Sequence, residues 1–183
     1  MPRGGRVLII GASGGCGIAG LQLAQYLGAS EVIGVSSGKN RELVLREGAT
    51  VHVDYKTTNF ADRYGASAKD NERFDVVYDC ASERGGVIYR TAAVACLRAA
   101  NTEEGRKHGQ YVTLNGRATM WLRWLTIGQR KNQHMFLTQF NTKDLNLIAQ
   151  LVDDGWENRT QRLNPMVGKV LPLTSQDEVV HRL

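Results

Sequence analysis

The sequence has few of the features that mark secreted or membrane proteins. It has only 3 cysteines in 183 residues, and Cys16, Cys80 and Cys96 are too far apart for a CxxC pair. This excludes a disulfide framework and a zinc knuckle. No apolar run approaches the roughly 18 residues that span a bilayer, and the first residues lack the apolar segment of a signal peptide. We therefore expect no membrane span and an intracellular location, cytoplasmic or mitochondrial.

Concentrated charge is also missing. The net charge is +5, but Lys and Arg are spread along the chain without a basic run or interleaved aromatic residues, so nucleic acid is not an expected partner. A small polyphosphate ligand suits this charge, and an ordinary basic surface explains it equally well. The 4 histidines are isolated and lack the short Cys/His spacings of a zinc site, so no metal is expected.

Several catalytic signatures are absent. No tyrosine has a lysine four positions on, which excludes the Tyr-x-x-x-Lys pair of short-chain dehydrogenases. Gly38-Lys39 is followed by Asn40 and not by Ser or Thr, which excludes a Walker A phosphate loop. No Ser/His/Asp or paired-carboxylate arrangement stands out. The sequence therefore predicts no catalytic residue of its own.

Alternating strand-like and helix-like segments are what the sequence does contain. Such alternation is typical of βαβ units, so we expect an α/β fold: a Rossmann doubly wound parallel sheet of about six strands with helices on both faces. Strand-like runs occur at residues 6–10, 31–35, 50–53, 74–79, 110–114, 134–138 and 168–171.

Two helices are predicted from apolar residues at three- and four-residue spacing. Residues 16–27 and 145–152 carry this pattern, and both helices should lie against the sheet. Gly28 and Gly155 follow these patterns and are expected to end the helices.

The glycine loop after the first strand predicts a dinucleotide site. Strand, glycines and helix follow one another directly, and this order makes a Gly-rich pattern specific. Gly11 would permit the tight turn, Gly14 would let backbone N–H groups approach a pyrophosphate, and Gly17 would let the helix pack closely on the sheet. The unpaired N–H groups and partial positive charge of the helix start favour phosphate. The alternative is a tight turn with a structural role only.

The end of the second strand favours NADP over NAD. An NAD site places an acid there to bind the ribose hydroxyls, whereas residues 35–41 contain no carboxylate before Glu42. Hydroxyls and cations favour a 2′-phosphate instead. The alternative is a solvated polar loop in which Ser37 or Asn40 only caps a helix.

A family resemblance is carried by residues 7–19, Gly48-Ala49, Asp54-Tyr55, residues 74–79 and residues 170–173. Together they resemble the medium-chain dehydrogenase/reductase superfamily, in its zinc-independent quinone oxidoreductase branch, which includes relatives of reticulon-4-interacting oxidoreductases. The resemblance implies that residues 1–183 form the NADP(H)-binding Rossmann domain. The GroES-like catalytic domain and the C-terminal returning segment of the family are expected to be absent, and a helix that starts near Ser175 and stops after two turns agrees with a fragment.

The resemblance also implies a set of cofactor contacts. The pyrophosphate would lie along the glycine loop, the 2′-phosphate beyond the second strand and the nicotinamide beyond the fourth and fifth strands. Cys16 stands where the family usually has valine, and residues 156–164 are longer than the family's usual link. The implied cofactor-binding residues are Gly11, Ser13, Gly14, Gly15, Cys16, Gly17, Ser36, Ser37, Lys39, Tyr55, Cys80, Ala81, Ser82 and Asn115.

The function that follows is hydride transfer from NADPH to a small quinone or enone, with the cofactor supplying most of the chemistry. The competing hypothesis is a non-catalytic NADPH-binding scaffold or sensor. An apolar run near Phe136 could form an edge strand that pairs two subunits, which makes a homodimer possible. An aromatic cluster at residues 120–125 fits a core or an interface better than a substrate cleft.

Overall fold

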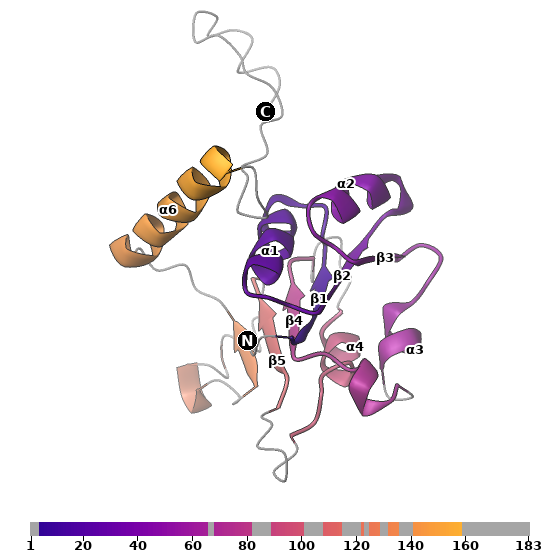
Figure 1. Cartoon of the computed structure of the whole chain (residues 1–183). Coiled ribbons are helices and arrows are strands. Elements are labelled where there is room, and N and C mark those ends of the chain that lie inside the picture. The colour runs from indigo at the N-terminus through magenta and orange to yellow at the C-terminus, as the bar shows by residue number, and fades with distance from the viewer. Residues whose placement is uncertain are drawn as a thin grey trace, which may run out of the picture.

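Six parallel strands form the centre of the molecule. The structure is a computed structural model that describes residues 4–65, 68–81, 89–100, 108–114, 122, 125–128, 132–135 and 141–158. The strand order is β3-β2-β1-β4-β5-β6 (Figure 1). The strands are β1 Arg6–Ile10, β2 Glu31–Ser36, β3 Val51–Asp54, β4 Val76–Asp79, β5 Gln110–Thr113 and β6 Gln133–Met135. This order, reversing at β1, confirms the Rossmann-type α/β fold.

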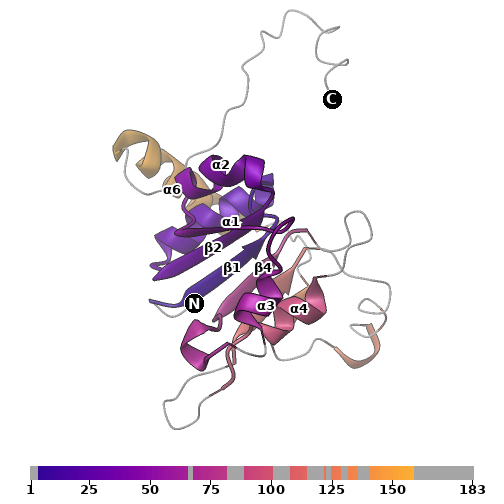
Figure 2. The same cartoon turned by 90° about the vertical axis from the view of Figure 1, so that its right-hand side faces the viewer.

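Helices cover both faces of the sheet (Figure 2). The helices are α1 Gly15–Tyr26, α2 Arg41–Arg46, α3 Phe60–Tyr64, α4 Arg90–Ala95 and α6 Thr142–Asn158, with 3-10 turns at Gly38–Asn40 and Asp70–Glu72. Helices α1 and α2 lie on one face, and α3 and α4 lie on the other.

The core explains why the first strand is apolar from Val7 to Ile10. Val7 and Ile9 pack in the cluster that includes residues of α1 and α2, whereas Leu8 and Ile10 pack in the cluster with residues of α3 and α4. All four side chains are at most 4% exposed. Alternate residues of a strand face opposite sides, so a strand between two helical layers must be apolar at every position.

Gly28 ends α1 as the sequence predicts. Its φ is +76°, and the N–H groups of Gly28 and Ala29 donate to the carbonyls of Gln25 and Ala24 at 2.9 and 3.0 Å. This is the double hydrogen bond of a Schellman motif, which requires a left-handed residue at that position.

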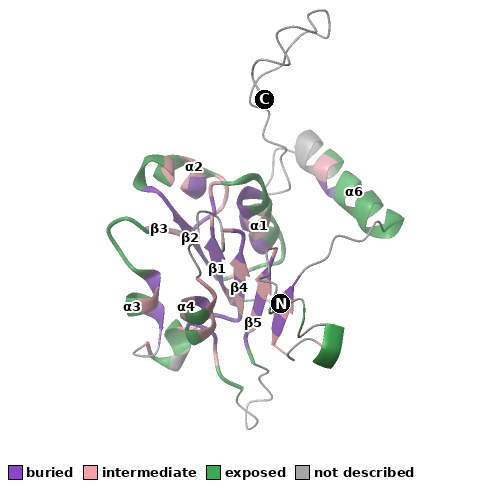
Figure 3. Ribbon diagram, turned by 180° about the vertical axis from the view of Figure 1, so that it is seen from behind, coloured by how far each residue is buried: buried purple, intermediate pink, exposed green. Residues whose placement is uncertain are grey.

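Helix α6, which corresponds to the helix predicted at residues 145–152, differs from the prediction in two ways. Helix α6 continues past Gly155 to Asn158, because glycine costs a helix only about 1 kcal/mol relative to alanine and leaves its hydrogen-bond ladder intact. Leu145 and Ile148 are 58% and 49% exposed, and only Leu151 is buried. The prediction that this apolar side lies against the sheet is therefore wrong for Leu145 and Ile148, and Figure 3 shows α6 coloured mostly as exposed. Periodicity predicts an apolar side of a helix and not the surface that this side meets.

Strand ends differ from prediction by a few residues. Strand β4 starts at Val76 and not at Phe74, which forms an isolated bridge with Leu97, and β6 starts at Gln133. The runs at residues 136–138 and 168–171, the expected helix near Ser175, Phe136 and most of the aromatic cluster lie outside the described residues. The homodimer stays a prediction. Within the described ranges, no helix is long and apolar enough to cross a membrane.

Arg98 and Asp75 form an ion pair near the start of the central strands. Arg98 Nη1 is 2.8 Å from Asp75 Oδ1, and the two side chains are 13% and 9% exposed. The other oxygen of Asp75 accepts the backbone N–H of Arg6 at 2.8 Å. The pair therefore ties the chain after α4 to the sheet.

Replacing Arg98 by methionine should lower the free energy of unfolding by about 3 kcal/mol, because it leaves a nearly buried carboxylate without its cation. Urea denaturation measures this loss. The matched control is Arg46→Met, which removes an arginine that is 67% exposed from its pair with Glu47; Glu47 keeps its hydrogen bond from Gln22, so the loss should be less than about 0.5 kcal/mol. Equal effects of the two substitutions would contradict the structural role of the Arg98 pair.

Candidate functional site

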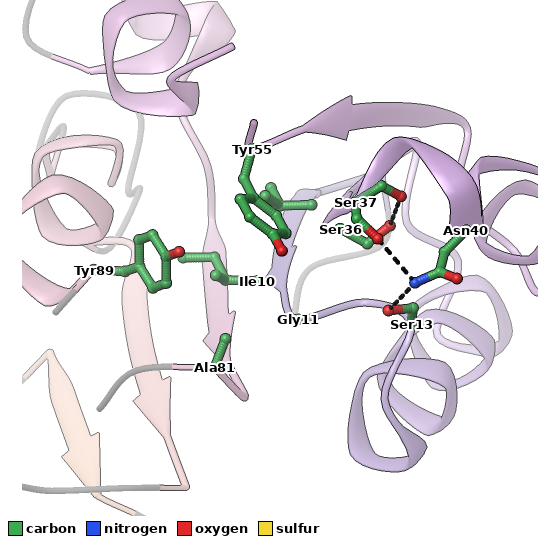
Figure 4. Close-up of a pocket in the computed structure, with 10 residues that line it drawn as sticks. Ile10, Gly11, Ser13, Ser36, Ser37, Asn40, Tyr55, Ala81 and Tyr89 are labelled. Carbon is green, nitrogen blue, oxygen red and sulfur yellow. Dashed lines mark hydrogen bonds between the residues drawn. The ribbon is translucent and has the colours of Figure 1, made fainter. Parts of the chain in front are cut away.

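A cleft opens where β1 and β2 end. Its volume is about 360 Å³, and it lies at the carboxyl edge of the sheet, where the strand order reverses. In open α/β sheets this is where ligands bind. The lining residues come from β1, β2, the turn after β2 and the segments after β3 and β4 (Figure 4). They are Ile10, Gly11, Ser13, Val35, Ser36, Ser37, Asn40, Tyr55, Ala81 and Tyr89.

The glycine loop forms one wall of this cleft. Gly11 has a φ of +81°, and its N–H and that of Ala12 both donate to the Val35 carbonyl at 3.0 Å. The chain therefore turns sharply between β1 and α1. A side chain at Gly11 would also be strained and would place a Cβ 3.0 Å from that of Ala81.

The start of α1 is open to a ligand. Helix α1 begins at Gly15 after an extended Gly14, with no side-chain hydrogen bond to its cap and no acid in its first turn. Gly14, Gly15 and Cys16 are exposed. The first N–H groups of a helix have no partner within it and carry a partial positive charge, so this end can bind a phosphate.

Gly17 explains how the helix start comes so close to the loop. A Cβ built at Gly17 would lie 2.7 Å from Ala12 Cα and closer still to the Gly11 carbonyl oxygen. These are backbone atoms that cannot rotate away. The close packing expected of this glycine is present.

Hydrogen bonds join the polar residues of the cleft across two segments. The Asn40 side chain donates to Ser13 Oγ at 3.0 Å and to Ser37 Oγ at 3.2 Å (Figure 4). Ser37 and Asn40 stand at the N-cap positions of the Gly38–Asn40 turn and of α2, but neither caps through its side chain, so the alternative of a polar loop that opens a helix is not decided. Asn40 connects the glycine loop to the turn after β2.

Asp54 is a residue near this site that the sequence argument missed. It pairs with Ser36 across β2 and β3, and a Cβ at Gly38 would lie 2.5 Å from Asp54 Oδ2. Residues 35–41 do lack an acid, yet strand pairing brings this one beside them. The signal in the sequence was the position of Asp54 at the end of the third strand, next to Tyr55.

The predicted cofactor-binding residues divide into three groups by their place in the structure. Six line the cleft, namely Gly11, Ser13, Ser36, Ser37, Tyr55 and Ala81. Six are described but do not line it, namely Gly14, Gly15, Cys16, Gly17, Lys39 and Cys80. Ser82 and Asn115 lie outside the described residues.

Cys16 lines a separate apolar hollow between α1 and the sheet. Tyr89 lines the cleft without having been predicted, and burial raises the pKa of its phenol, so the ring stays neutral.

Comparisons with known proteins agree with this architecture. Residues 15–100 match the zinc-binding dehydrogenase family. The chain is 42% identical over 77 residues to a medium chain reductase from Acremonium sp, an alignment that covers 42% of this chain and 21% of the relative. It is 35% identical over 102 residues to 2-methylene-furan-3-one reductase from Solanum lycopersicum, covering 50% of this chain and 24% of the relative.

The chain is thus similar to zinc-binding dehydrogenases over residues 15–100 and to two named reductases over parts of its length. The quinone oxidoreductase of Escherichia coli, solved in complex with NADPH, shares the fold with a TM-score of 0.55 at 18% identity, over 85% of this chain and 47% of that one. The alignments with the two reductases cover less than a quarter of the length of either reductase.

The family that residues 15–100 match depends on a nicotinamide cofactor. The residues present fit such a cofactor, because the helix start has no side-chain cap, Gly17 allows it to lie close to the loop, and Gly11 and Ser13 of that loop line the cleft. Among the described residues, no group of three His, Cys, Asp or Glu could hold a metal ion.

Proposed function

We propose that this chain binds NADP(H) in the cleft and is the cofactor-binding domain, over residues 1–183, of a reductase of small quinones or enones. The observation that carries the proposal is the uncapped first turn of α1 beside a cleft lined by serine hydroxyls. A bound cofactor would supply the hydride. The residues of this chain bind and orient it.

The pyrophosphate would lie over the start of α1. Gly15 and Cys16 offer backbone N–H groups there, whereas the N–H of Gly14 donates to the Gly11 carbonyl oxygen at 3.1 Å, and no side chain caps the helix. Two phosphates need no cationic side chain at such a position, because several N–H groups and the helix dipole act together. Ser13 and Asn40, joined at 3.0 Å, border the same place.

The preference for NADP rests on the segment after β2. Ser36 and Ser37 line the cleft, whereas the lining residues in the described part of the chain include no carboxylate. Lys39 is exposed in the turn that follows, where it can reach a 2′-phosphate. Asp54 opposes this preference, because its carboxylate lies beside Gly38, but it also accepts the N–H of Lys56 at 2.9 Å.

The substrate class is inferred from relatives. The Solanum lycopersicum relative is named 2-methylene-furan-3-one reductase and the Escherichia coli neighbour quinone oxidoreductase. We propose the same class of electron-poor alkene or quinone for the protein in which this domain acts. If the complete protein oxidises NADPH with such a substrate, the result supports the hypothesis of an enzyme. If it binds NADPH tightly without turnover, the result supports the hypothesis of a sensor or scaffold.

Lys39→Ala should reduce the preference for NADPH over NADH about fivefold to tenfold, because a charge-assisted contact to phosphate contributes about 1–1.5 kcal/mol. Fluorescence titration of the chain with both nucleotides measures the ratio of the two dissociation constants. The matched control is Lys69→Ala, an exposed lysine just before the Asp70–Glu72 turn, which should leave the ratio unchanged. An unchanged ratio in Lys39→Ala would contradict the assigned role.

A further inference from the structure

A histidine lies behind the cleft, in the strand next to the one that carries the serines. His52 sits on β3 opposite Gly34, and Ser36 lies two residues further along β2. Side chains at these alternate positions point to the same face of the sheet. His52 Nε2 is 2.9 Å from Ser36 Oγ. No part of the proposed cofactor contact set includes this imidazole.

Ser36 links the histidine to the cleft. The residue is 3% exposed and lines the cleft, and its hydroxyl lies 3.3 Å from the Ser37 carbonyl oxygen as well as 2.9 Å from the imidazole. A hydroxyl has one hydrogen to donate and two lone pairs that accept. When Ser36 donates that hydrogen, the hydroxyl oxygen can accept the N–H of His52.

The charges around His52 favour a neutral ring in the free protein. Burial lowers the pKa of His52, and Arg41 on α2 lowers it further. Asp54 on the same strand and the Ser37 backbone act in the opposite direction. A phosphate dianion in the cleft would add negative charge on the same side as Asp54 and so favour the imidazolium.

We propose that His52 is a positioning residue for the 2′-phosphate of NADP(H): it donates its Nε2 hydrogen to Ser36, so that the Ser36 hydroxyl donates to the phosphate, and the ring takes up a proton as the cofactor binds. The proposal rests on the proposed function. The proton comes from solvent and adds to Nδ1, and no other bond forms or breaks. NADH, which lacks the 2′-phosphate, causes no such uptake.

The sign of the pH dependence follows from this coupling. The bound-state pKa of His52 is raised above its free-state pKa, so the added affinity is fully present below the free-state pKa and is lost as pH rises through the bound-state pKa. Each unit of difference between the two is a tenfold change in affinity. NADPH should therefore bind more weakly as pH rises from about 6 to about 8.

The test is titration calorimetry of the whole chain with NADPH and NADH across this pH range, in two buffers of different ionisation enthalpy. The decisive variant is His52→Gln, which keeps a donor amide but cannot titrate. Between about pH 6 and pH 8 the wild type should lose about tenfold more NADPH affinity than His52→Gln, and only the wild type should take up the extra proton. The 2′-phosphate titrates in the same way with both proteins, so its contribution cancels when the wild type is compared with His52→Gln. NADH profiles of the two proteins should coincide.

A second variant tests the path through Ser36. In a Ser36→Ala background, His52→Gln should change the NADPH profile less than twofold, and circular dichroism verifies that each variant is folded. Parallel NADPH profiles for wild type and His52→Gln, with NADPH still preferred over NADH, overturn the inference and leave the proposed function standing. Equal affinity of the wild type for NADPH and NADH at every pH overturns the proposed NADP preference, and the inference with it.

Discussion

Gly17→Val is expected to lower the free energy of unfolding by at least about 3 kcal/mol and to abolish dinucleotide binding. The new Cβ would lie 2.7 Å from Ala12 Cα and closer to the Gly11 carbonyl oxygen. Because both are backbone atoms, no rotamer relieves the contact, and α1 must move away from the loop. Thermal and urea unfolding measure the loss of stability, and nucleotide titration measures the loss of binding.

The control for this result lies two residues earlier in the same helix turn. A Cβ at Gly15 meets no atom within 4 Å, so Gly15→Ala should leave stability unchanged or raise it by about 0.5 kcal/mol, since alanine favours the helix. Similar stability of Gly17→Val and wild type would contradict the close approach of α1 to the loop. Strong destabilisation by Gly15→Ala would show that any side chain in this turn is harmful.

Gly14→Val is expected to abolish binding of both NADPH and NADH, with at least about a hundredfold rise in each dissociation constant, while the fold persists. Gly14 has an extended conformation with φ −83° and ψ 164°, which valine adopts readily. A Cβ there would only touch the Gly11 carbonyl oxygen at 3.5 Å. The valine would instead fill the space through which a pyrophosphate approaches the first N–H groups of α1.

Gly14→Ala provides the graded comparison. Its smaller side chain should weaken both nucleotides less than valine does, and both variants should melt within a few degrees of the wild type. The combination of an intact fold and lost binding separates this position from Gly17. Unchanged nucleotide affinity in Gly14→Val would remove the helix start from the binding site.

The sequence predicted the fold well because local signals agreed with one another. Strand β1 is apolar from Val7 to Ile10, the glycine loop follows it at once, and Gly28 ends the next helix. Each of these features depends on residues close together in the chain. Hydrophobic periodicity and glycine positions report such local geometry directly.

The contacts that the sequence analysis missed join residues that are far apart in the chain. The contacts of Asn40 with Ser13 and of His52 with Ser36 span 27 and 16 residues, and Asp54 reaches Gly38 only through the pairing of β2 with β3. Strand register fixes these neighbours, and composition around each residue does not reveal it. The predicted burial of Leu145 and Ile148 on α6 was wrong for a similar reason, because an apolar stripe on a helix does not show which surface would cover it.

The most direct test of the cofactor site is an NMR titration of the isotopically labelled chain with NADPH. We predict that the largest amide shifts occur at Gly14, Gly15 and Cys16 and at Ser36 and Ser37, and that NADH shifts the first group but moves the two serines much less. Absence of shifts at the start of α1 with millimolar NADPH and NADH would contradict the account.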